Sequence, residues 1–123
     1  MVGANTMEAD PDLVAESRQL DPLVGLFRLL SDKTRMQILM ILARGERNVG
    51  SLCDELRLPQ PTVSHHLGLL RSKNLILNRR DGKQVFYTLD GRVAVDHAGR
   101  MSINAPSFHI RIGDPVPHDG NAS

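Results

Sequence analysis

The sequence predicts a mainly α-helical domain with a small β-hairpin. Apolar residues recur at helical spacing from Leu23 to Leu70. Around Asp81-Gly82, a dipeptide typical of tight hairpins, the period of the side-chain pattern changes to the two residues that are typical of a strand. The 123 residues suffice for one domain, and with 3% aromatic residues and no tryptophan its core must be aliphatic. No apolar run approaches the roughly 20 residues of a membrane span, and the single cysteine, Cys53, fits a reducing compartment. We therefore expect a cytoplasmic protein without a membrane-spanning segment.

Helix-start signals and apolar spacing place the predicted helices. After a disordered tail over residues 1–11, Asp12 to Leu20 favours a short helix, and Asp21-Pro22 supplies an N-cap and a first-turn proline for the next one. Further helices are predicted over residues 34–43, 50–57 and 60–72, with a tight turn between the last two. A short helix, a tight turn and a second helix form a helix-turn-helix unit.

The helix predicted over residues 60–72 has an apolar arc and a polar start. At about 100° per residue, Val63, Leu67 and Leu70 fall on one side and would be buried. Four polar residues lie outside this arc near the start of the helix: Gln60, Thr62, Ser64 and His65. A helix whose apolar face is buried in the core, and whose first turns expose hydroxyl, amide and imidazole groups, suits the DNA major groove. His66 lies on the shoulder of the arc, where a partly buried, hydrogen-bonded structural histidine is expected.

The hairpin that follows is predicted from strands over residues 75–80 and 83–89, joined by Asp81-Gly82. Its tip carries Arg79, Arg80 and Lys83, whose charges suit contact with phosphates. The surrounding charge agrees with this, because residues 35–92 carry ten bases and five acids, whereas residues 1–32 carry six acids and two bases. A basic hairpin directly after a helix-turn-helix is a wing, and the regional charge predicts an anionic partner.

The end of the chain is predicted to add a last short helix over residues 92–102. Residues 12–103 would then form the DNA-binding and dimerisation domain, and residues 104–123 a C-terminal extension. Within that extension Phe108, Ile110 and Ile112 alternate with polar residues, which predicts a short strand at residues 107–112. We expect these three side chains to pack against the body or a partner rather than to line a small-ligand pocket.

Four segments resemble the ArsR/SmtB family of bacterial winged-helix repressors, over roughly residues 21–92. They are Leu26 to Arg35, Leu52 to Leu56, Gln60 to Leu67, and the wing at Asp81-Gly82-Lys83. The resemblance implies a homodimeric repressor that binds an inverted-repeat operator in double-stranded DNA and is released by an inducer. It also implies that Gln60, Thr62, Ser64 and His65 contact bases and nearby phosphates, that Arg79, Arg80 and Lys83 serve the wing, and that the first helices and residues 93–102 form the dimer interface.

The two metal sites of that family are not matched in this sequence. Asn48 and Gly50 stand where one site has a Cys-x-Cys pair, and Arg92 replaces the histidine that would follow Asp90 in the other. Ile103 and Pro106 fall near the distal ligands of that second site. We therefore expect no metal and no other cofactor, and the sequence leaves the inducer open.

Three residues remain candidates for sensing a signal: Cys53, His97 and His109. Cys53 is better interpreted as a small buried side chain than as a reactive thiol, because Asp54 and Glu55 beside it disfavour a thiolate. His97 lies near the expected dimer interface, so an unfamiliar metal site between subunits stays an alternative.

The leading hypothesis is a sequence-specific DNA-binding repressor. The alternative is a winged-helix module that docks on protein and barely touches DNA, because the fold alone does not decide function. An enzyme is not expected: Cys53 has no evident base, the adjacent Ser64 and His65 do not form a catalytic triad, and the chain has no glycine-rich phosphate loop.

Overall fold

The structure is a computed structural model that describes residues 10–113. The elements in chain order are α2 (Pro11–Gln19), α3 (Asp21–Leu30), α4 (Lys33–Leu42), β1 (Arg47–Asn48), α5 (Val49–Leu56), α6 (Gln60–Ser72), β2 (Ile76–Asp81), β3 (Gln84–Leu89), β4 (Val93–Val95), β5 (Met101–Ala105) and β6 (Phe108–Ile112). The predicted tail at residues 1–11 lies outside the described residues except for its end, where Asp10 caps α2 and Pro11 begins it. Residues 114–123 of the predicted extension also lie outside.

The helices predicted between residues 12 and 72 are confirmed, and local side-chain contacts explain where several of them begin and end. Asp32 caps α4 by accepting a hydrogen bond from the Arg35 backbone N–H at 3.0 Å. Asn48 caps α5 in the same way, and Arg57 ends that helix in the left-handed conformation, with a φ of 56°. Asn74 adopts a φ of 60° just after α6, as its type favours.

The core of the helix-turn-helix lies between α4, α5 and α6. Ile38, Leu39 and Leu52 are fully buried there, and so are Val63 and Leu70 on the predicted apolar arc of α6. Leu67 completes that arc at 1% exposure. The predicted buried face of α6 is confirmed, and it fixes which side of the helix faces solvent.

The wing is part of a three-stranded antiparallel sheet in the order β1-β3-β2. The short strand β1 was not predicted; its Arg47 and Asn48 pair with Tyr87 and Phe86 of β3. Asp81 pairs with Gln84, so the loop of the hairpin is Gly82-Lys83, one residue later than the predicted Asp81-Gly82 turn. Gly82 has a φ of +65°, a conformation that a residue without a Cβ adopts without strain.

The predicted helix over residues 92–102 is wrong, because this region begins a second antiparallel sheet in the order β4-β5-β6. Alternating Val93 and Val95 favour a strand, and Gly99, with a φ of +81°, forms part of the turn into β5. The Asp96 carboxylate holds that turn by accepting hydrogen bonds from the backbone N–H groups of Ala98 and Arg100, both at 2.9 Å. These local preferences and the pairing of β4 with β5 together override a weak helical pattern.

The predicted strand at residues 107–112 is confirmed as β6, which pairs with β5. Phe108, Ile110 and Ile112 are half-buried and pack against the core, as expected. Phe108 also borders a cavity, which differs from the expectation that none of the three lines a pocket. Because β5 runs from Met101 to Ala105, the predicted boundary between residues 103 and 104 falls inside a strand. The described part of the extension is therefore continuous with the body of the protein.

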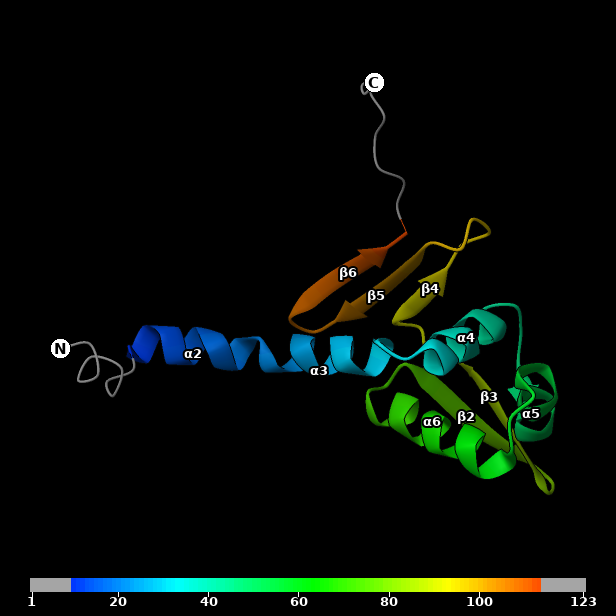
Figure 1. Ribbon diagram of the computed structural model, residues 1–123. Coiled ribbons are helices and arrows are strands. Elements are labelled where there is room, and N and C mark those ends of the chain that lie inside the picture. Colours follow the sequence, from blue (N-terminus) through cyan, green and yellow to red (C-terminus); the bar gives the residue numbers. More distant parts are fainter. Residues whose placement is uncertain (1–9, 114–123) are drawn as a thin grey trace.

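The helices α2 and α3 lie nearly end to end and form a rod that projects from the body (Figure 1). The β4-β5-β6 sheet lies above α3 and α4 in that view, with α6 and the wing below. The rod exposes large apolar side chains to solvent: Leu13, Leu20, Val24 and Phe27. None of the helices within residues 10–113 combines the length and the apolar character that crossing a membrane requires.

Candidate nucleic-acid interface

The first turns of α6 present the four polar residues that the sequence singles out. Gln60, Thr62, Ser64 and His65 are all exposed, while the arc behind them is buried. Within residues 10–113, none of these four side chains makes a hydrogen bond to the protein, so their donors and acceptors are available to a partner. The start of α6 also carries the positive end of the helix dipole, which favours an anion such as phosphate.

His66 has a different role from its neighbour, as predicted. It is half-buried, and its Nδ1 lies 3.1 Å from Nη1 of Arg35. The Nε of Arg35 donates to the Leu29 carbonyl oxygen at 2.6 Å, so one guanidinium joins the end of α3 to α6. The Arg35 backbone N–H also holds the pKa of Asp32 below its usual value. This role of Arg35 was not predicted, although the residue lies inside one of the segments that resemble the family.

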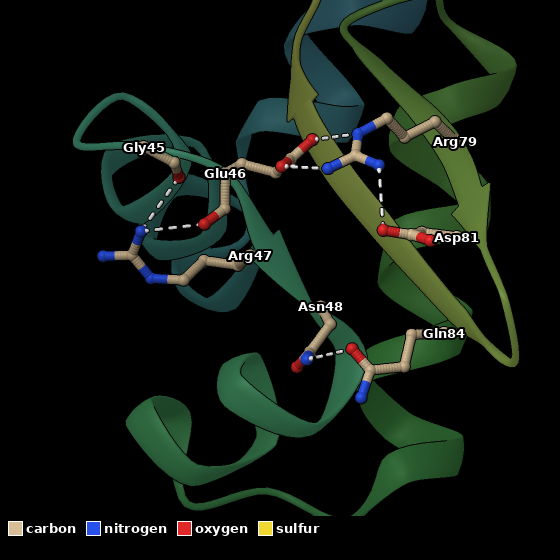
Figure 2. Close-up of polar contacts among 7 residues, drawn as sticks. All are labelled: Gly45, Glu46, Arg47, Asn48, Arg79, Asp81 and Gln84. Carbon is tan, nitrogen blue, oxygen red and sulfur yellow. Dashed lines mark hydrogen bonds and ion pairs between the residues drawn. The ribbon is translucent and has the colours of Figure 1, made fainter.

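Arg79, predicted as a wing contact, is bound within the protein (Figure 2). Its Nη2 and Nε lie 2.6 and 2.7 Å from the two carboxylate oxygens of Glu46, and its Nη1 lies 3.8 Å from Asp81. The guanidinium also lies over the Phe86 ring, 4.7 Å from the ring centroid. The hydrogen bonds to Arg79 lower the pKa of Glu46, and those to Glu46 raise the pKa of Arg79. This pair fastens the wing to the segment before β1.

All three wing cations are exposed, but Arg80 and Lys83 are the two without an ion pair in the described part of the chain. Arg80 pairs with Val85 in the register, so it lies on the opposite face of the hairpin from Arg79 and Phe86. Lys83 lies in the loop at the tip, and neither residue has an ion pair within the described part of the chain. Both are free to meet a phosphate.

The wing tip and the start of α6 line the same hollow. A cleft of about 290 Å³ is bounded by Gln60, by Lys83 and Gln84, and by Asn48 to Gly50 at the start of α5. Asn48 Nδ2 donates to Gln84 Oε1 at 3.2 Å across this cleft (Figure 2). The structure thus brings Gln60 and Lys83, which are 23 positions apart in the sequence, to one surface. The sequence alone did not predict that these two side chains lie close together.

The three candidate sensing residues do not come together. Cys53 is half-buried on α5 and packs against the core, in agreement with its interpretation as a packing residue. His97 is exposed in the turn between β4 and β5, while His109, in contact with Asn104, lies toward the other end of the sheet. Over residues 10–113, no group of three His, Cys, Asp or Glu side chains is arranged to hold a metal ion.

Comparison with known proteins agrees with this geometry. Residues 32–77 match the family model described as bacterial regulatory protein, arsR family. The chain is 34% identical over 116 residues to the HTH-type transcriptional regulator KmtR of Mycobacterium tuberculosis. The aligned region covers 94% of this chain and 85% of KmtR. It is 42% identical over 71 residues to the arsenical resistance operon repressor of Escherichia coli, covering 57% of this chain and 61% of that repressor.

Solved structures give the same result. The homodimeric winged helix-turn-helix DNA-binding domain of Mb0332 from Mycobacterium bovis superimposes with a TM-score of 0.56 at 30% identity, over 68% of this chain and 74% of that one. HlyU from Vibrio cholerae superimposes with a TM-score of 0.54 at 37% identity, over 57% of this chain and 76% of HlyU. The chain therefore belongs to the ArsR family and is a winged helix-turn-helix transcriptional regulator, not an enzyme.

Proposed function

We propose that the protein is a cytoplasmic, homodimeric repressor that binds an inverted-repeat DNA site. In this proposal α6 enters the major groove with Gln60, Thr62, Ser64 and His65, and the wing follows the phosphates with Arg80 and Lys83. The observation that carries it is the exposed, unpaired polar start of α6 beside Lys83, on a helix whose opposite side is buried. The relatives named as repressors support the direction of regulation. The alternative, a module that docks on protein, has no observation in its favour.

We assign the dimer contact to the rod formed by α2 and α3. Leu13, Leu20 and Phe27 repeat every seventh residue and are about half exposed or more, with Val24 beside them. Contiguous exposed apolar side chains of this size mark a surface that another protein covers. Residues 93–102, which were expected to add a helix to the interface, lie instead in β4, β5 and the turn between them, so this assignment is based on the rod alone. A twofold dimer would place two copies of α6 about one helical turn of DNA apart.

Base recognition by α6 is tested by substitution at its start. Thr62→Ala and His65→Ala are each expected to weaken operator binding by about 1–3 kcal/mol. Each substitution should also reduce the discrimination between bases at particular positions of the operator. Fluorescence anisotropy on the protein's own upstream region, with single base-pair changes introduced in turn, measures both effects. His97→Ala removes an exposed histidine far from α6 and serves as the control. Equal affinity of the unaltered protein for this region and for random DNA would refute sequence-specific binding.

The wing residues should differ in the salt dependence of binding. Each of Arg80→Ala and Lys83→Ala is expected to reduce the slope of log K against log salt by about 0.9, because each removes one phosphate contact. Arg79→Ala should leave that slope nearly unchanged, because its guanidinium is held by Glu46. A slope change for Arg79→Ala equal to that for Lys83→Ala would show that DNA displaces Glu46 from Arg79.

A further inference from the structure

A cavity of about 360 Å³ lies between the end of α6, the helix α3 and the β5-β6 hairpin. Pro22 and Leu26 of α3 form one wall, and Ile103 to Phe108 form the other. Leu75, just after α6, closes part of it. The volume falls within the range of small-molecule sites in proteins. None of the residues assigned to DNA recognition lines this cavity, so it is a separate feature of the fold.

The lining combines apolar walls with positive charge. Lys73 and Arg92 both border the cavity, and no aspartate or glutamate does. Lys73 has no ion pair within the described residues. The nearest acid to Arg92 is Asp90, whose Oδ1 lies 4.0 Å from the Arg92 Nε while it accepts a hydrogen bond from the Arg92 backbone at 2.9 Å. Two cations at an apolar hollow without a lining carboxylate favour a ligand that is both anionic and apolar.

The backbone around the cavity positions both cations. The ammonium of Lys73 lies beside Gly25 of α3, where a Cβ would come within 3.3 Å of its Nζ, so the glycine leaves room for it. The Asn104 backbone N–H donates to the Arg92 carbonyl oxygen at 2.9 Å and ties Arg92 to β5. The two charges therefore reach the cavity from different elements.

The cavity does not lie on the surface that we assign to the dimer. On α3, at about 100° per residue, Pro22 and Leu26 lie on a different side from Val24 and Phe27.

We propose that this cavity binds a small organic anion, a monocarboxylate with an apolar body of about the size of hexanoate. Its carboxylate would meet Lys73 and Arg92, and its apolar part would lie against Leu26, Ile103 and Phe108. The cavity also touches the junction between the recognition helix and the wing, because Leu75 accepts a hydrogen bond from Asp90 and precedes β2 directly. Occupation of the cavity would thus change DNA affinity, a consequence that rests on the proposed function.

The binding step is tested without DNA. Hexanoate is titrated into the full chain and followed by amide NMR shifts, beside acetate, which has the charge without the apolar body, and hexanamide, which has the body without the charge. We expect saturable shifts for hexanoate, concentrated at residues 72–75 and 105–108, and binding at least about tenfold weaker for the other two. Absence of saturation, equal binding of hexanamide, or shifts located elsewhere would overturn the proposal.

Charge variants refine the test. Lys73→Gln and Arg92→Gln are each expected to weaken hexanoate binding about tenfold. Both positions are exposed, so the fold should persist. Arg18→Gln removes one exposed charge from α2 and should leave binding unchanged. Unaltered hexanoate affinity in Lys73→Gln and Arg92→Gln would also contradict the proposal.

The effect on DNA is measured separately, by operator titration with and without saturating hexanoate. We expect the operator affinity to change at least about threefold, and an unchanged affinity would refute the coupling. Loss of hexanoate binding with intact operator binding would refute the cavity proposal alone. Hexanoate binding in a protein that binds no operator would refute the proposed function and leave the ligand site standing.

Discussion

Replacing Phe27 with aspartate is expected to convert the protein to a monomer and to lower its operator affinity by about 100-fold or more. Phe27 is 50% exposed on the rod, in line with Leu20 at 52%, so a carboxylate there would be buried without a partner in the dimer. In a monomer the two half-sites are no longer bound together. Binding both half-sites at once raises the overall affinity for the operator by a factor of roughly 10²–10⁴. Sedimentation equilibrium measures the assembly state, and anisotropy measures the affinity.

A matched substitution distinguishes the dimer contact from a general effect of charge. Ala15→Asp places the same carboxylate on α2, roughly opposite Leu13 around the helix, and should leave both the dimer and the affinity intact. Circular dichroism of Phe27→Asp should show retained helix content, because the side chain is not part of the monomer core. A dimeric Phe27→Asp protein with full operator affinity would refute the assignment of the rod as the interface.

Leu67→Ala is expected to destabilise the protein by about 2–5 kcal/mol. Leu67 is 1% exposed at the centre of the buried arc of α6, so truncation leaves a cavity in the core that α6 covers. Urea unfolding monitored by circular dichroism measures the change in free energy of unfolding. The protein supplies its own control, because Leu77→Ala removes the same atoms from a side chain that is 51% exposed.

Leu77→Ala should cost well under 1 kcal/mol if burial determines the difference. Comparable destabilisation by both substitutions would mean that Leu77 is covered in the folded assembly, for example by a second copy. Operator affinity at low temperature, where the Leu67→Ala protein is still folded, should stay close to that of the unaltered protein, because Leu67 is buried on the side of α6 opposite the proposed DNA-contacting residues.

The sequence predicted the helix-turn-helix well because its determinants are local. The first-turn proline of α3, the Asn74 stop and the spacing of Val63, Leu67 and Leu70 each act within a few residues, and each is confirmed. The predicted N-cap is wrong, because Asp21 is itself the first residue of α3 and Leu20 is the N-cap, without a side-chain hydrogen bond. The outward position of His65 and the structural role of His66 follow from the same helical geometry. Within these segments, local preference and tertiary packing favour the same structure.

The features that the sequence did not predict depend on contacts between distant residues. Glu46 and Arg79 are 33 positions apart, so the spacing of charges gave no sign that this wing arginine is bound within the protein. Strand β1 is two residues long, and it exists only because β3 offers a free edge. The helix expected over residues 92–102 failed for a similar reason, since pairing with β5 favours the strand for Val93 to Val95.

The side chain of Asn48 caps α5 and also donates to Gln84 of the wing, while its backbone lies in β1. The wing is therefore held at a set position relative to α5, and so relative to α6, which packs against α5. It is not connected to the helices through its two strands alone. In the proposed complex, with α6 in the major groove and the wing on the phosphates, this fixes the separation that the DNA must match. Sequences that narrow or widen their grooves readily would bind best, including at base pairs that no side chain reaches.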